Sequence, residues 1–152
     1  MLQNTGLIAQ TIQLALAPVF VLVAIGNIMS ILSTRLGRVV DRSRILQEMH
    51  SSTTGDDHDA VVREIRMVDQ RIRIIGRAIM LLVASGLTIG ITVAVLFLEE
   101  LADAKLQQVA AAFFFGAIML LMSALWLFMR ETRLAAAALQ IPKAYLELHR
   151  DL

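Results

Sequence analysis

The stretch that decides the fold is Asn27–Gln47, NIMSILSTRLGRVVDRSRILQ, which joins an apolar segment to a basic one with no turn signal between them. A helix turns about 100° per residue, so a helix over this stretch carries three stripes. The stripes are small residues (Gly26, Ser30, Ser33, Gly37), polar residues (Asn27, Thr34, Arg38, Asp41) and, opposite, apolar residues. Small and polar side chains within a bilayer face protein or water. We therefore expect this helix to be covered by something other than lipid.

The composition indicates one membrane-embedded domain. Apolar residues make up 57% of the 152 residues, and the runs 78–98 and 109–129 contain no charged residue. This apolar fraction is higher than that of typical soluble domains, and each charge-free run is long enough to cross a membrane as a helix. The net charge of +1 gives no reason to expect a nucleic-acid partner, and the lack of cysteine excludes disulfides and thiolate chemistry.

The chain divides into seven segments by hydropathy and charge. They are an N-terminal segment (1–17), a first span (18–34), a hairpin (35–77), a second span (78–98), an outer loop (99–108), a third span (109–129) and a tail (130–152). The N-terminal segment is either a short interfacial helix or the start of the first span. Pro18 is expected in the first turn of that span. The predicted fold class is an all-α integral membrane protein with three transmembrane helices and a cytoplasmic antiparallel helical hairpin between spans 1 and 2.

The hairpin is predicted from its polar centre and its apolar spacing. The polar tract 51–59, SSTTGDDHD, is expected to be a loop. After it, apolar residues recur in steps of four and three, as in a coiled coil, at Val61, Ile65, Val68, Ile72, Ile75 and Ile79. The two arms are expected to pack on each other or on neighbouring subunits.

The distribution of basic residues predicts the orientation. Nine Lys or Arg residues lie in 35–77 and four in the tail, against one in the outer loop and none in 1–17. The positive-inside rule places the N-terminus outside, and the hairpin and C-terminus in the cytoplasm.

Small residues on spans 2 and 3 indicate close helix packing. They recur every four residues at Gly86, Gly90 and Ala94 and at Ala112 and Gly116. Three spans have a thin interior, and the small and polar stripes of span 1 add surfaces that need a partner. We therefore predict a homo-oligomer, with a ring around span 1 as the favoured arrangement.

Pro18, Ala24-Ile25-Gly26 and the segment 35–42, RLGRVVDR, resemble a family of small bacterial membrane proteins catalogued as domain of unknown function 2721. The resemblance covers nearly the whole chain. It implies a three-span protein of the bacterial inner membrane and implies no activity. The topology is also similar to that of proton-driven stator proteins. Spans 1 to 3 contain no ionisable side chain, which disfavours a proton-driven motor or pump.

No motif for catalysis or cofactor binding is found, so no enzyme, catalytic residue or cofactor is predicted. The three histidines, His50, His58 and His149, all lie outside the spans. The sequence GDDHD, 55–59, offers oxygen and imidazole ligands for a divalent cation, but consecutive residues rarely converge on one ion. We favour a solvated linker there and predict no metal site.

Two groups of polar residues are candidates for function. Arg35, Arg42, Arg44 and Arg77 are expected to contact anionic lipid headgroups, or simply to flank the spans on the cytoplasmic side. Asn27 is expected either to hydrogen-bond a neighbouring helix or to face a water-filled path.

Two function hypotheses follow. In the first, the protein is an ion channel whose pore is lined by span 1 through Asn27, Ser30, Thr34, Arg38 and Asp41. In the alternative, it is a membrane scaffold or accessory subunit that uses the same stripes to bind the helices of an unidentified protein partner, or anionic lipid.

Overall fold

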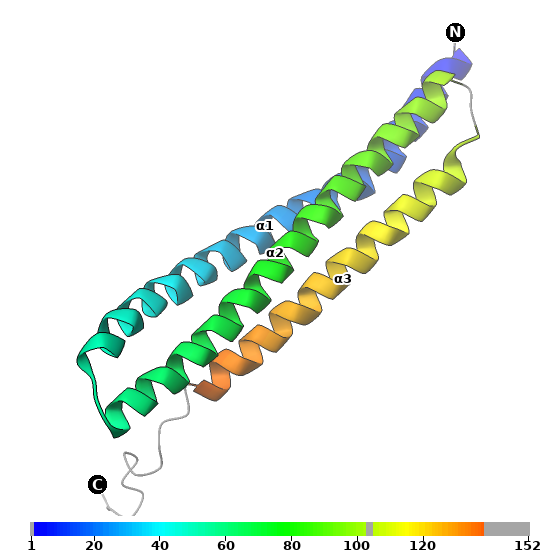
Figure 1. The fold of residues 1–152 in the computed structure, drawn as a ribbon. Coiled ribbons are helices and arrows are strands. Elements are labelled where there is room, and N and C mark those ends of the chain that lie inside the picture. The colour runs from blue at the N-terminus through cyan, green and yellow to red at the C-terminus, as the bar shows by residue number, and fades with distance from the viewer. Residues whose placement is uncertain (1, 103–104, 139–152) are drawn as a thin grey trace, which may run out of the picture.

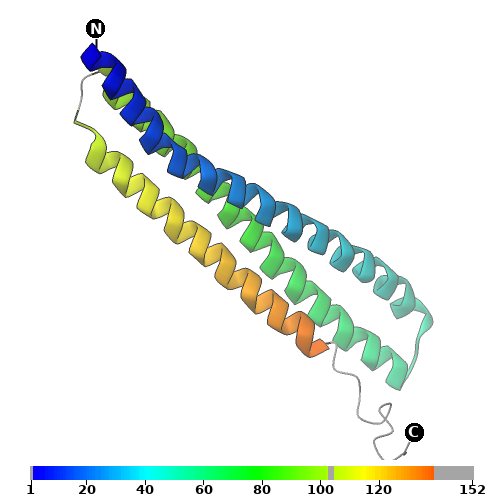
Figure 2. The same ribbon diagram turned by 180° about the vertical axis from the view of Figure 1, so that it is seen from behind.

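The computed structural model describes residues 2–102 and 105–138, which form three long helices. These are α1 (Leu2–Ser52), α2 (Asp56–Ala102) and α3 (Gln107–Ala138). Figures 1 and 2 show an elongated bundle in which α2 lies between α1 and α3. Over the described residues there is no strand, and the predicted all-α fold is confirmed. Each helix is long and apolar enough to cross a membrane, which supports a three-span membrane protein.

The core is built on a seven-residue repeat that runs through all three helices. Its buried members are Ile25, Leu32, Val39 and Leu46 on α1, Val61, Val68, Ile75, Leu82 and Ile89 on α2, and Ala110, Ala117 and Ala124 on α3. A strict repeat of seven keeps one side of each helix against its neighbour over many turns. Of the six members of the predicted seam on 61–79, Val61, Val68 and Ile75 are buried in this core, and the other three are partly buried and pack against it.

The contact between α2 and α3 is close because the buried apolar residues on its α3 side are alanines. Ser85 is buried there, and its hydroxyl donates a hydrogen bond to the carbonyl oxygen of Ala117 at 2.8 Å. Thr88 and Thr92 instead donate to carbonyls of their own helix, at Ala84 and Thr88. Hydroxyls that bond back in this way need no partner from another helix. Contacts between α1 and α3 are few, so α2 holds the bundle together.

The turn between α1 and α2 is shorter than the predicted loop at 51–59. The helices end and begin at Ser52 and Asp56, leaving only 53–55 between them. Hydroxyls of the tract terminate α1 by donating to its last carbonyls, as from Ser51 to Glu48 and from Thr53 to Met49. Gly55 has a φ of 65°, a left-handed conformation that glycine adopts readily. The polar residues of 51–59 are thus mostly helix ends.

The helices also extend beyond the predicted spans. Helix α1 runs unbroken from Leu2 through Pro18, which therefore lies inside a helix and not in a first turn. Pro18 is buried one repeat before Ile25, so it contributes to the core. At the same end of the bundle α2 continues to Ala102, into the predicted outer loop (Figure 1). The part of the predicted tail after Ala138 lies outside the described residues.

Candidate functional site

The polar stripe of α1 faces away from the rest of the bundle. Asn27, Thr34 and Asp41 follow one another at intervals of seven, each two residues after a member of the core repeat. Two residues correspond to about 200° around a helix, so the stripe points away from the core. These three residues and Ser30 are exposed in the chain. The hydroxyl of Thr34 donates to the Ser30 carbonyl at 3.0 Å, whereas the Asn27 amide forms no side-chain hydrogen bond within the described residues.

The predicted packing residues line open surfaces of the chain. Gly26, Gly86, Gly90 and Ala94 lie together in an apolar groove of about 670 Å³ between α1 and α2. A Cβ atom added at Gly26 or Gly90 would meet nothing within 4 Å. Ser33 and Gly37 are exposed on α1, further along the helix than the residues that line the groove. Ala112 and Gly116 line a recess between α2 and α3. These small residues therefore stay exposed or partly exposed in a single chain, and their predicted role in helix packing stays a prediction.

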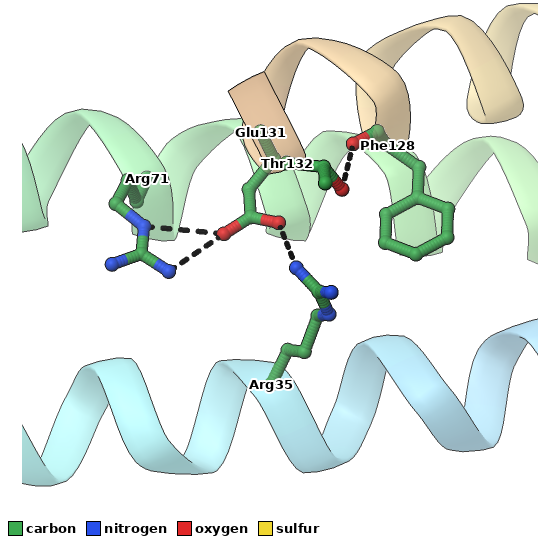
Figure 3. Close-up of polar contacts among 5 residues, drawn as sticks. All are labelled: Arg35, Arg71, Phe128, Glu131 and Thr132. Carbon is green, nitrogen blue, oxygen red and sulfur yellow. Dashed lines mark hydrogen bonds and ion pairs between the residues drawn. The ribbon is translucent and has the colours of Figure 1, made fainter. Parts of the chain in front are cut away.

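A buried carboxylate joins all three helices where the apolar segments end. Glu131 of α3 is fully buried and accepts a hydrogen bond from Arg35 of α1 at 2.9 Å. Its other oxygen accepts two hydrogen bonds from Arg71 of α2, at 3.1 and 2.8 Å. Figure 3 shows both guanidinium groups converging on this carboxylate. The Arg35 guanidinium also lies 5.1 Å from the centre of the Phe128 ring, a cation–π distance. We call Arg35, Arg71 and Glu131 the ion triad.

Sequence reasoning did not identify Glu131 or Arg71 as members of a site. The signal was nevertheless present, because Glu131 follows Ala110, Ala117 and Ala124 at the next interval of seven. A carboxylate at a core position must be paired if it is to stay ionised there. Two arginines meet this requirement, and they also bring α1 into contact with α3.

The remaining arginines differ in their environment. Arg42 of α1 holds Glu64 of α2 through two hydrogen bonds of 2.7 and 2.9 Å. The hydrogen bond to Glu64 and the negative charge of that carboxylate raise the pKa of Arg42 above its usual value, although burial acts in the opposite direction. Arg44 and Arg77 are exposed and form no ion pair within the described residues. Of the four arginines predicted to contact lipid headgroups, two are thus bound to carboxylates of neighbouring helices.

The histidines and aspartates of the turn do not form a metal cluster. No group of three or more His, Cys, Asp or Glu side chains in the described ranges is placed to hold a metal ion. Asp56, Asp57 and Asp59 occupy the first turn of α2, where negative charge interacts favourably with the helix dipole. The rings of His50 and His58 lie 4.5 Å apart across the turn. His149 lies outside the described residues.

The fold and the site define a small multi-pass membrane protein whose helices are joined by an ion triad at one end of their apolar segments. The family described as "Protein of unknown function (DUF2721)" matches residues 15–141, which confirms the resemblance found in the sequence. The chain belongs to this family. Comparison with curated proteins and with solved structures finds no match.

Proposed function

We propose that the protein is a homo-oligomeric ion channel whose pore is lined by the outward face of α1. The observation that carries this proposal is the exposure of Asn27, Ser30, Thr34 and Asp41 on that face. An amide in contact with lipid tails loses its hydrogen bonds to water and gains none. A row of such groups is stable if neighbouring copies, with water between them, cover the face. Arg38 lies at the edge of the same stripe.

The groove between α1 and α2 supports an assembly of this kind. Its α1 wall includes Gly26, next to Asn27, so the groove and the polar stripe occupy neighbouring sides of α1. A helix from an adjacent copy can approach the backbone closely where side chains are small. One contact repeated around a ring would fill the groove of every copy and leave the stripes facing the axis.

We also propose an orientation in the bacterial inner membrane. The excess of Lys and Arg in 35–77 favours the cytoplasm for the turn between α1 and α2 and for the C-terminus. The ion triad then lies at the cytoplasmic boundary of the membrane, and the N-terminus lies outside.

A scaffold or accessory subunit is the second candidate. The same groove favours it, because an apolar surface lined by Gly86, Gly90 and Ala94 accepts a helix from another protein as well as from another copy. In that case the polar stripe would hydrogen-bond the partner, and no ion would pass.

Asn27→Leu separates the two candidates. A channel with this change is expected to keep the wild-type oligomeric mass and to show an altered ion flux in liposomes, by severalfold, because the pore loses a polar lining group. A scaffold is expected to assemble less well and to carry no flux. Mass measurements in detergent and in nanodiscs give the oligomeric state, and flux assays in liposomes give the ion conduction.

Ser123→Leu is the matched control. Asn27 and Ser123 each lie eight residues before a member of the ion triad, on α1 and α3, and both are exposed. The control should leave flux and mass unchanged, because Ser123 bonds only to the Met119 carbonyl of its own helix. If wild-type liposomes conduct no more than empty ones, and Asn27→Leu purifies as the wild-type oligomer, the pore proposal is wrong.

A further inference from the structure

A basic pocket lies beside the ion triad, on the flank of α1 that faces α3. It has a volume of about 340 Å³. Its lining includes one arginine from α2 and three from α1, with apolar residues behind them: Arg71, Arg35, Arg38, Arg42, Val39, Val68 and Ala135. All three helices therefore contribute to one concave, positively charged surface.

The pocket has more positive charge than the chain neutralises. Glu131 is shared by Arg35 and Arg71, and Glu64 is bound by Arg42. Arg38 takes part in no ion pair within the described residues. The pocket thus holds four guanidinium groups against two carboxylates, and most of their N–H donors form no hydrogen bond within the described residues. An anion entering the pocket would find both net charge and unengaged donors.

The position of the pocket limits the kind of anion. Arg35 directly follows the first apolar span, and Ala135 lies just beyond the third. The pocket therefore opens at the level where lipid headgroups lie. Val39 and Val68 form an apolar wall, which keeps water from one side and strengthens electrostatic attraction.

We infer that this pocket binds a phosphate group. A phosphate has more acceptor oxygens than a carboxylate, so several guanidinium forks from different helices can share it, each through paired hydrogen bonds. The group can belong to the headgroup of an anionic phospholipid or to free phosphate, and the chemistry of recognition is the same for both. The inference does not depend on ion conduction or on oligomer formation.

Arg38→Gln tests the inference, and Arg44→Gln is its control. Both arginines are exposed on α1 and form no ion pair in the described part of the chain, but only Arg38 lines the pocket. In one arm, the protein is extracted from vesicles of equal parts phosphatidylcholine and phosphatidic acid, and retained lipid is counted by native mass spectrometry. In the other, inorganic phosphate is titrated by calorimetry into protein in phosphatidylcholine nanodiscs.

The wild type is expected to retain phosphatidic acid in preference to phosphatidylcholine, or to bind inorganic phosphate. Arg38→Gln should weaken that binding about tenfold, the effect of one lost charge-assisted hydrogen-bonding group, and Arg44→Gln should leave it unchanged. Ala135→Leu, which fills the pocket without removing charge, should weaken it as well. Preference for the lipid identifies a headgroup site, and binding of inorganic phosphate alone identifies a soluble ligand.

Two results would overturn the inference. One is that neither probe binds the wild type. The other is that Arg38→Gln and Arg44→Gln reduce binding equally, because the attraction would then come from diffuse surface charge. Helix content measured by circular dichroism on each variant shows that the comparison is made between folded proteins.

Discussion

The two faces of α1 differ in chemistry and in exposure. The inner face, with Leu32, Val39 and Leu46, is buried against α2 and is satisfied within one chain. The outer face, with Asn27 and Thr34, is exposed and carries polar groups along a segment apolar enough to lie in a membrane. The inner face therefore specifies how the chain folds, whereas covering the outer face is the role that we propose for neighbouring copies. Changes on the two faces should affect different measurements.

The largest loss of stability is expected from Leu46→Ala, on the inner face. Leu46 is fully buried and lies beyond the apolar span, where burial removes it from water. Truncating such a leucine costs about 3 kcal/mol, because apolar contact is lost and a cavity remains. Denaturant unfolding in mild detergent measures the free energy of unfolding.

Ile45→Ala is the matched control, since Ile45 directly precedes Leu46 and is 49% exposed. The same measurement should show a loss of less than about 1 kcal/mol. Equal losses at the two positions would contradict the distinction between an inner and an outer face.

Glu131→Gln should rank second in its effect on stability. The change keeps the shape of the side chain but leaves Arg35 and Arg71 without a carboxylate at the point where α1 meets α3. Breaking a buried ion pair on one side costs about 3 kcal/mol or more. The two arginine side chains remain 30% and 24% exposed, so water recovers part of that loss and a value of about 2 kcal/mol is expected.

A double variant shows whether the ion triad acts as a unit. If Arg35 and Glu131 interact directly, Arg35→Gln combined with Glu131→Gln should cost less than the two single changes added together. Strict additivity would mean that the carboxylate and the guanidinium stabilise the fold independently.

The sequence predicted the fold because the features that determine it are periodic. The recurrence of Val61, Val68 and Ile75 at intervals of seven was visible as a seam, and the structure places these residues in the core. The charge-free runs on α2 and α3 likewise predicted helices able to span a membrane. Patterns of this kind depend on the local geometry of one helix and need no knowledge of its neighbours.

The ion triad could not be predicted in the same way, because its members lie far apart in the sequence. Arg71 and Glu131 are 60 residues apart, and their contact depends on how α2 and α3 align. Nine arginines in 35–77 offered no local reason to select Arg35 and Arg71.

The length of the turn between α1 and α2 was predicted wrongly for a different reason. Ser, Thr and Asp favour helix ends as well as loops, so the composition of 51–59 did not fix where the helices stop.

The smallest loss of stability is expected from Glu64→Gln. This loss should depend on the salt concentration, whereas the loss caused by Glu131→Gln should not. Glu64 pairs with Arg42 where both side chains are more than a third exposed. An exposed pair contributes less than about 1 kcal/mol, even with two hydrogen bonds, because water screens both charges. Raising the salt concentration to about 1 M shortens the screening length to about 3 Å, so the difference between Glu64→Gln and wild type should then shrink toward zero. The loss caused by Glu131→Gln should persist at the same salt concentration, because its carboxylate is shielded from solvent ions. If both losses vanished at high salt, the ion triad would be no more protected from solvent than the Arg42–Glu64 pair. The contact that the triad makes between α1 and α3 would then add little stability to a fold held by its apolar repeat.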